Sequence, residues 1–277
     1  MSSHYIENLP INKIIQGDCV NILNTLPNDC IDLVITSPPY DDLRDYKGYK
    51  FDVHSLVNIL VKKIKMGGVV VWVVGDSVVD GSETGTSFKH AQAFINAGFN
   101  LHDTMIYSKN TFAFPSTKEA MRYHQIFEYM YIFSVGKPKT FNPIKDKLNA
   151  CKRTGGDCKR RKDGSQVRGD RGGIPLNKYG MRGNIWEYTI GGNHTSSYKQ
   201  ASKHPATFPE QLATDHINSW SNPGDLVVDP MCGSGTTCAM AYKLERNYIG
   251  IDVSWEYCQL SKDRVEHEKK IKEIEIF

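Results

Sequence analysis

The chain has 277 residues and a formal net charge of +3, with 40% hydrophobic and 23% charged residues. This length can bury a substantial core in one large domain or two small ones, and the composition is ordinary for a globular protein. No apolar run approaches about 20 residues, so no transmembrane helix is expected. The first residues lack the basic start and apolar core of a secretory signal. A cytoplasmic, nucleoid-associated protein is therefore predicted.

Seven cysteines, an odd number, are widely and irregularly spaced. This spacing does not indicate a disulfide framework, and free thiols in a reducing compartment are the simpler interpretation. Cys151 and Cys158 have no second Cys or His pair nearby, which makes a zinc site the less favoured alternative. The sequence thus predicts no metal site.

Strand-like and helix-like segments alternate along the chain. Short apolar runs predict strands over residues 31–36, 69–74, 101–107, 127–133, 226–228 and 248–252. Apolar residues at helical spacing predict helices over 53–65, 88–97 and 237–244, the first of them ending at Gly67-Gly68. The strands 101–107 and 127–133 are expected to form a hairpin. The alternation favours an α/β fold with a mainly parallel sheet.

Residues 137–203 differ from the rest, because the periodicity weakens and Gly, Lys and Arg become frequent. Within 151–173, eight basic residues stand against three aspartates, a net charge of +5. A solvated surface loop is one interpretation. The other is an insert that contacts DNA phosphates, since clustered cations attract a polyanion and a Gly-rich loop can become ordered on it. The predicted DNA-binding residues are Lys152, Arg153, Lys159, Arg160, Arg161, Lys162, Arg168 and Arg171.

A Gly-rich turn follows the predicted strand 226–228, with the sequence Asp229-Pro230-Met231-Cys232-Gly233-Ser234-Gly235-Thr236-Thr237. Glycines allow close approach of a ligand, and the following helix start offers free N–H groups. A tight structural turn, a dinucleotide site, a phosphate loop and an S-adenosylmethionine site share this pattern. The missing Gly-Lys-Ser/Thr ending disfavours the phosphate loop. Asp252 ends the next strand, where a carboxylate can accept hydrogen bonds from ribose hydroxyls, as in nicotinamide enzymes also.

A second segment, Thr36-Ser37-Pro38-Pro39-Tyr40, follows the predicted strand 31–36. Its prolines fix the backbone and lack N–H donors, while their carbonyls still accept hydrogen bonds. A rigid serine hydroxyl and a proline carbonyl can hold an exocyclic base amine, and Tyr40 can stack on the base. Alone, this segment is most simply a Pro-Pro loop. Together with the Gly-rich turn and Asp252, it favours methyl transfer to an amine.

Over nearly its whole length the chain resembles the DNA amino-methyltransferases, in the class whose catalytic motif precedes the cofactor motif. Residues 12–19 resemble the family's opening strand, whose acid, here Asp18, lies near the cofactor adenine. Residues 203–209 resemble the segment that walls the methionine end of the cofactor. The resemblance implies that Ser37, Pro38, Pro39 and Tyr40 are catalytic. It implies that S-adenosylmethionine is bound by Asp18, Thr36, His204, Pro205, Asp229, Pro230, Cys232, Gly233, Ser234, Gly235, Thr236, Thr237 and Asp252.

The same resemblance implies a Rossmann-like methyltransferase fold with a mixed, mostly parallel sheet and helices on both faces. Residues 1–136 and 204–277 would be the catalytic and cofactor-binding halves of one domain, with 137–203 a target-recognition insert. Two departures are Met231 where the family usually has Phe, and Asp252 where Glu is common.

Ser37, rather than Asp or Asn, resembles the enzymes that methylate N4 of cytosine, and N6 of adenine is the alternative. Direct transfer to a flipped base in duplex DNA is expected. A nicotinamide-dependent oxidoreductase and a non-catalytic DNA-binding protein are the less favoured alternatives. A cognate restriction endonuclease and a homodimer are left open, and no membrane partner is expected.

Overall fold

The computed structural model describes residues 9–39, 51–110, 121–151, 157–169, 175–190, 195–203 and 209–275; of 157–159, 168–169, 202–203 and 275 it describes only the backbone. Several predicted site residues lie outside these ranges, namely Tyr40, Lys152, Arg153, Arg171, His204 and Pro205. The chain divides into two units, residues 1–142 with 184–277, and residues 143–183.

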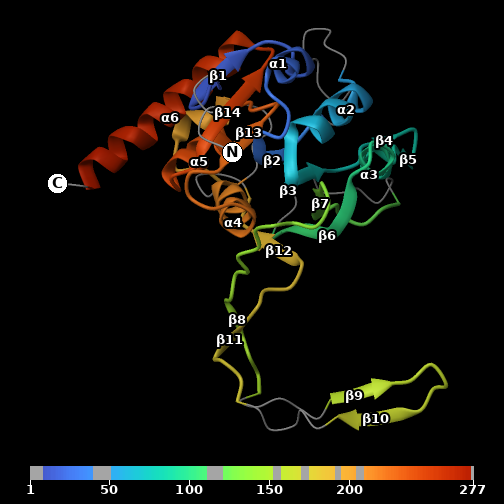
Figure 1. Cartoon of the computed structure of the whole chain (residues 1–277). Helices are drawn as coiled ribbons and strands as arrows, with labels where there is room; N and C mark the ends of the chain where they lie inside the picture. The colour runs from blue at the N-terminus through green and yellow to red at the C-terminus, as the bar shows by residue number, and fades with distance from the viewer. Residues whose placement is uncertain are drawn as a thin grey trace. The chain divides into compact units, whose positions relative to one another are not determined.

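The larger unit contains an eight-stranded sheet (Figure 1). Its strands are β1 (Lys13–Gln16), β2 (Ile31–Thr36), β3 (Ile64–Val74), β6 (Asn100–Lys109), β7 (Phe127–Ser134), β12 (Ile185–Tyr188), β13 (Leu226–Asp229) and β14 (Asn247–Asp252). They are arranged in the order β1-β14-β13-β2-β3-β7-β6-β12. Every neighbouring pair is parallel except the two that β7 makes with β3 and β6. The predicted mostly parallel sheet and the hairpin of β6 and β7 are therefore confirmed.

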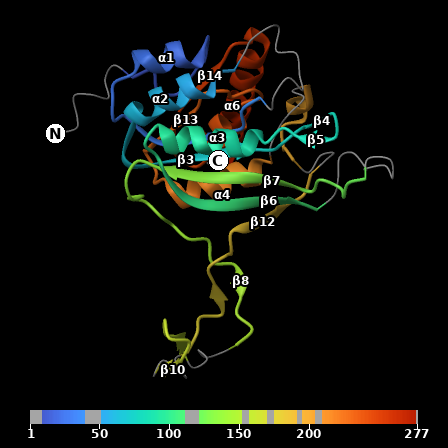
Figure 2. The same ribbon diagram turned by 90° about the vertical axis from the view of Figure 1, so that its right-hand side faces the viewer.

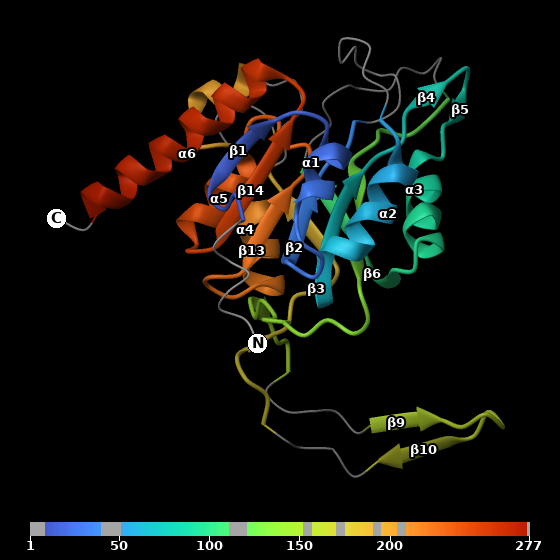
Figure 3. The same ribbon diagram turned by 45° about the horizontal axis from the view of Figure 1, so that its top comes forward.

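Helices cover both faces of this sheet. They are α1 (Cys19–Thr25), α2 (Val53–Lys63), α3 (Thr86–Asn96), α4 (Glu210–Trp220), α5 (Thr236–Lys243) and α6 (Trp255–Glu275). Leu23 of α1, Leu56 of α2 and Phe94 of α3 share one apolar cluster, whereas α5 packs between α4 and α6. Figure 2 shows α3 and α4 on opposite sides of the sheet, and Figure 3 shows α6 beside α5 and β14. The Rossmann-like fold is confirmed.

One predicted boundary is wrong. The helix predicted over 53–65 ends at Lys63, and β3 begins at Ile64 rather than at residue 69. Gly67 and Gly68 lie inside this strand, where Gly67 has a φ of +80° and its N–H donates to the Val135 carbonyl. A Cβ at Gly68 would lie 2.6 Å from the Ile64 side chain. Pairing with neighbouring strands thus decides the conformation here, and the glycines mark a close approach instead of a helix end.

The smaller unit, residues 143–183, contains two short antiparallel ladders. β8 (Lys147–Leu148) pairs with β11 (Tyr179–Gly180), and β9 (Asp157–Arg160) pairs with β10 (Gln166–Gly169). Arg182 forms an ion pair with Asp146 next to the first ladder. None of the side chains described in this unit is buried. A further small hairpin, β4 (Val78–Val79) with β5 (Ser82–Glu83), belongs to the larger unit, as does the short 3-10 helix η4 (Lys199–Lys203).

No helix in the described part of the chain is long and apolar enough to cross a membrane.

Candidate active site

The two segments singled out in the sequence meet at one edge of the sheet. β2 and β13 are parallel neighbours, and Val34 pairs with Val228. Because their carboxyl ends lie at the same edge, Ser37 follows β2 beside the turn that follows β13. The Thr36 hydroxyl donates to the Asp229 carboxylate with Oγ1 2.7 Å from Oδ1. The predicted catalytic and cofactor segments are therefore joined by a direct hydrogen bond.

Asp229 is a buried acid at the centre of this junction. It is 2% exposed, and besides Thr36 it accepts a hydrogen bond from the Met231 backbone N–H, at 3.1 Å. Burial raises the pKa of Asp229 to about 6, although the hydroxyls of Thr36 and Thr237 act in the opposite direction. The hydrogen bonds from Thr36 and Met231 thus offset part of the cost of burying the charged carboxylate.

The Gly-rich turn is shaped by its two glycines. Gly233 and Gly235 have φ values of +49° and +79°, and the Gly235 N–H donates to the Cys232 carbonyl at 2.7 Å. A Cβ at Gly235 would lie 2.8 Å from the Cα of Ser261 on α6. The Ser261 hydroxyl donates to the Gly233 carbonyl at 2.7 Å. Both the backbone conformation and the contact with α6 therefore require glycine at position 235.

Asp252 lies at the end of β14, next to this turn. Its Oδ2 accepts from the Gly233 N–H and its Oδ1 from the Ser254 N–H, both at 2.9 Å. The residue is partly exposed, and burial raises the pKa of its carboxyl. A carboxylate oxygen has two lone-pair sites, so each can accept a second hydrogen bond. The residue therefore fits a ribose with its two hydroxyl donors.

Asp18 lies beside Asp252 because the Gly17 N–H donates to the Asp252 carbonyl at 2.8 Å. Its carboxylate accepts from the Asn21 N–H at 2.9 Å and caps α1. The acid predicted to lie near the adenine thus has a structural partner of its own, and its role toward the cofactor stays a prediction.

The predicted cofactor residues fall into two groups by exposure. Asp18 and Asp252 are partly exposed. Buried side chains, which shape the turn from within, belong to Thr36, Asp229, Pro230, Cys232, Ser234, Thr236 and Thr237. For example, Thr237 donates to the Ile35 carbonyl at 3.3 Å. The backbone of the turn and the two partly exposed side chains are therefore the groups best placed to contact a ligand.

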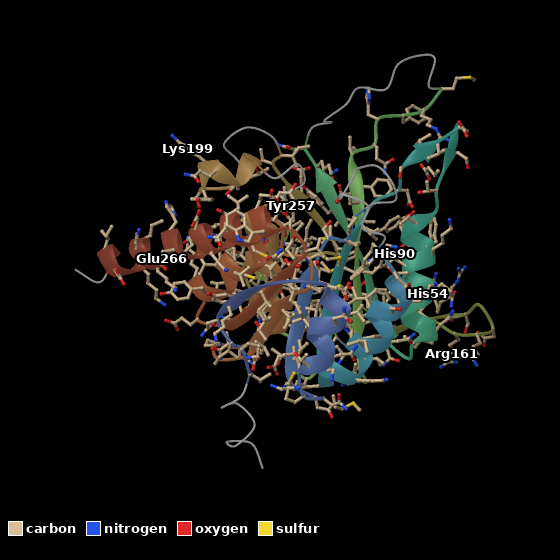
Figure 4. The ribbon with its side chains drawn as sticks, turned by 90° about the horizontal axis from the view of Figure 1, so that it is seen from above. His54, His90, Arg161, Lys199, Tyr257 and Glu266 are labelled. Atoms are coloured by element: carbon tan, nitrogen blue, oxygen red, sulfur yellow. The ribbon has the colours of Figure 1, made fainter. Side chains whose placement is uncertain are left out.

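In the catalytic segment, Ser37 and Pro39 are partly exposed and Pro38 is buried. Two further residues near the end of β3 are structural. Trp72 is fully buried and its Nε1 donates to Nδ1 of His90, at 3.2 Å. His90 lies on α3 and is labelled in Figure 4. Asp76 accepts from the backbone N–H and the hydroxyl of Ser87, at 2.9 and 2.6 Å. Asp76 therefore anchors the first turn of α3.

A buried arginine near the Gly-rich turn was not predicted. Arg264 of α6 has a fully buried side chain, and its Nη1 donates to the Ser234 carbonyl and hydroxyl and to the Thr236 hydroxyl, at 3.3, 3.2 and 2.8 Å. Its Nη2 lies 2.7 Å from the Glu210 carboxylate, at the start of α4, and 3.0 Å from the Ser196 hydroxyl. One guanidinium therefore joins the turn to two other segments. No sequence pattern indicates this role, because a charged residue in a charge-rich helix is most simply exposed.

This arrangement defines a class of protein. The sheet order, the Gly-rich turn after β13 and the Ser-Pro-Pro segment after β2 together describe a Rossmann-like methyltransferase. Residues 31–263 match the family model described as DNA methylase, of the N6/N4 type. The chain belongs to this family. It is a site-specific DNA amino-methyltransferase, and the resemblance stated from the sequence is confirmed.

Individual relatives agree with the family. The chain is 50% identical over 243 residues to the orphan methyltransferase M.BamHII of Bacillus amyloliquefaciens, covering 86% of this chain and 90% of that protein. It is 27% identical over 261 residues to the type II methyltransferase M.BglII of Bacillus subtilis, covering 91% and 68%.

Solved structures share the fold. The PvuII DNA methyltransferase, which is described as cytosine-N4-specific, superposes with a TM-score of 0.67 at 22% identity, covering 93% of this chain and 90% of that one. The complex of M1.HpyAVI with S-adenosylmethionine gives a TM-score of 0.59 at 23% identity, covering 91% and 98%. The ligand of that complex is the cofactor that the sequence predicts for this chain.

Proposed function

We propose that this enzyme transfers a methyl group from S-adenosylmethionine to the exocyclic N4 amine of cytosine in duplex DNA. The observation that carries the proposal is the hydrogen bond between Thr36 and Asp229, because it joins the Ser-Pro-Pro segment to the Gly-rich turn. An amine held at Ser37 then lies next to a methyl donor bound at the turn. Asp252, with its spare lone pairs, is the proposed partner of the donor's ribose.

The proposed chemistry depends on positioning. The amine nitrogen is a weak nucleophile, since its lone pair is delocalised into the base. The Ser37 hydroxyl and the Pro38 carbonyl would accept its two N–H groups and aim the lone pair at the methyl group. Orientation of this kind can remove up to about 7–11 kcal/mol of the barrier. Bound S-adenosylmethionine supplies an electrophilic methyl group, so the chain needs no covalent nucleophile of its own.

Adenine is the second candidate substrate, because its N6 amine presents the same two donors. Ser37 in the first position of the motif supports cytosine. The base must leave the duplex in either case, which costs a few kcal/mol and is least for a mismatched base. Tyr40 is proposed to stack on the flipped base.

Residues 137–203 are proposed as the target-recognition insert between the two halves of the catalytic domain. The smaller unit, 143–183, lies within these limits. Its exposed Arg160, Arg161 and Lys162 support a role in DNA binding. His204 and Pro205, which follow the insert, remain proposed neighbours of the cofactor. The proposal requires neither a cognate endonuclease nor a homodimer.

The test is analysis of nucleosides from duplex DNA incubated with the enzyme and S-adenosylmethionine. N4-methylcytosine is expected, and it should be lost in Ser37→Ala. N6-methyladenine would establish the alternative substrate. Undiminished methylation by Ser37→Ala would contradict the role proposed for this hydroxyl. Sequencing of the methylated DNA would then give the recognition sequence.

A further inference from the structure

The β9–β10 ribbon in the smaller unit has two chemically different faces. Arg160 pairs with Gln166, and Lys159 pairs with Val167. Because residues directly opposite each other share a face and neighbours alternate, Arg160 and Gln166 lie on one face and Val167 on the other. The same register places position 168 on the face of Arg160 and Gln166. This face is called the 160/166 face below.

A tight turn connects the two strands. The Gly164 N–H donates to the Arg161 carbonyl at 3.0 Å, and the Arg161 N–H donates to the Ser165 carbonyl at 2.8 Å. Gly164 has a φ of +83°, which suits a short hairpin with a left-handed residue. The Asp163 carboxylate accepts from the Ser165 N–H and hydroxyl at 2.9 and 2.6 Å. The turn's carboxylate therefore has partners inside the turn, beside the exposed cations of Arg161 and Lys162.

The side chains that the structure describes in this ribbon form no buried apolar layer. Arg160, Gln166 and the turn are exposed, and Val167 is 37% exposed. Two-stranded hairpins in water are marginally stable at best. A cationic ribbon in a DNA methylase has a polyanion as its natural partner, because the charges are complementary. Two strands about 4.8 Å apart also fit a major groove about 12 Å wide.

We propose that the ribbon enters the major groove and that its 160/166 face contacts base edges, so that Arg160 and Gln166 determine the methylated sequence. Arg is suited to the two acceptors of guanine, and Gln to the acceptor and donor of adenine. Arg161 and Lys162 in the turn contact phosphates, which contributes affinity without sequence preference. This inference rests on the proposed function. It goes further by naming the residues that select the sequence around the target base.

The experiment replaces three ribbon residues by threonine, one in each variant. Arg160→Thr and Gln166→Thr alter the 160/166 face, and Val167→Thr alters the opposite face as a matched control. Threonine favours strands, so the ribbon's backbone preference is retained. Each full-length variant methylates a library of random duplexes, and sequencing gives the preferred site. Rates are then measured on the parent's site and on single-base changes of it.

Arg160→Thr and Gln166→Thr are each expected to lose roughly ten- to hundredfold discrimination at one base position, while Val167→Thr keeps the parent's preference. An unchanged preference, or a uniform loss of rate on every sequence, in both 160/166-face variants would overturn the inference. A changed preference in Val167→Thr as large as theirs would do so too. A parent enzyme that methylates no DNA would instead show that the proposed function is wrong. In that case, duplexes selected from the random library by binding to the parent replace the methylated site. Fluorescence anisotropy then compares binding of a selected and a scrambled duplex by the parent and the 160/166-face variants, which tests the ribbon independently.

Discussion

Thr36 and Asp229 are separated by 193 positions in the chain, yet the hydroxyl of one donates to the carboxylate of the other at 2.7 Å in the core. Thr36 precedes the serine that is proposed to hold the target amine, and Asp229 begins the Gly-rich turn. The segment proposed to hold the target amine and the Gly-rich turn are therefore aligned by a buried hydrogen bond, which forms without a ligand. Changes at this contact should affect both stability and the geometry of transfer.

Thr36→Val is the direct test of this contact, because valine keeps the shape and removes the hydroxyl. The buried carboxylate then loses a donor, which should reduce the free energy of unfolding by about 1–3 kcal/mol. Methylation should fall more than cofactor affinity does, since the segment after β2 loses its alignment with the turn. Urea unfolding, cofactor titration and methylation rates measure the three effects. Thr36→Ser, which keeps the hydroxyl, should restore most of the rate; if it does not, the hydrogen bond is not the cause.

The raised pKa of Asp229 predicts a pH dependence of stability. The folded-state pKa of about 6 lies above the ordinary value of 3.8, so the folded protein binds this proton more tightly than the unfolded chain does. The contribution to stability is fully present below the ordinary value and is lost as pH rises through about 6. Asp229→Asn removes this titration. The parent should therefore lose about 2 kcal/mol relative to the variant between pH 4 and 7, by urea unfolding at each pH. A constant difference across this range would contradict the raised pKa.

The strands differ in how well the sequence predicts their bounds. Strands such as β2 and β13 were predictable because they are short, mainly apolar runs, buried on both faces. The start of β3 could not be predicted, because Ile64 pairs with Ile31 of β2 and the strand then continues through Gly67 and Gly68. In the sequence, such glycines after a helical pattern indicate a helix end. The nearness of Thr36 and Asp229 followed from the family resemblance. Local periodicity cannot show which strands are neighbours.

The burial of Arg264 and its contacts could not be predicted from the sequence. Its partners Glu210 and Ser234 are 54 and 30 positions away, and nothing in the local pattern distinguishes it from its exposed neighbours. Burial of a charge is a property of the assembled helices α4, α5 and α6.

Removal of this guanidinium should be costly. Burial alone would raise the pKa of Glu210, but hydrogen bonds from Ser197 and Arg264 leave it below its usual range. Arg264→Met leaves the Glu210 carboxylate without its cation and should reduce the free energy of unfolding by about 3 kcal/mol, together with weaker cofactor binding. The lowered pKa of Glu210 stabilises the folded protein at pH values above the ordinary pKa of a glutamate. The stability lost in Arg264→Met should therefore shrink as the pH falls and Glu210 becomes protonated.

The matched control for Arg264 is Lys272, which forms an ion pair with Glu245 at 3.1 Å while 37% and 66% of their side chains are exposed. Lys272→Met should cost less than about 1 kcal/mol. Similar losses of unfolding free energy in Arg264→Met and Lys272→Met would show that burial does not determine how much Arg264 contributes to stability.

Asp252→Asn tests the proposed ribose contact. The amide keeps one acceptor but loses the charge and one carboxylate oxygen, so binding of S-adenosylmethionine should weaken at least about tenfold, as one charge-assisted hydrogen bond is worth about 1.5–3 kcal/mol. Isothermal titration calorimetry measures the affinity. The matched control is Asp225→Asn, whose carboxylate accepts from the Asn222 N–H before β13. Equal affinity in Asp252→Asn and the parent would remove this residue from the cofactor site.

Gly235→Ala tests the close approach of the Gly-rich turn to α6. Two separate costs are expected: a left-handed backbone, about 1–2 kcal/mol, and overpacking against Ser261, about 1–3 kcal/mol. A substitution at Gly81 distinguishes the two costs. Its φ is also +79°, but a Cβ there would have nothing within 4 Å. Gly81→Ala should show only the backbone cost in urea unfolding. Gly235→Ala should lose more stability and should also bind cofactor more weakly, since Ser261 and the Gly233 carbonyl it contacts must shift. Equal losses of stability in the two variants would mean that α6 can shift at little cost. The contact between position 235 and Ser261 would then not determine the conformation of the turn.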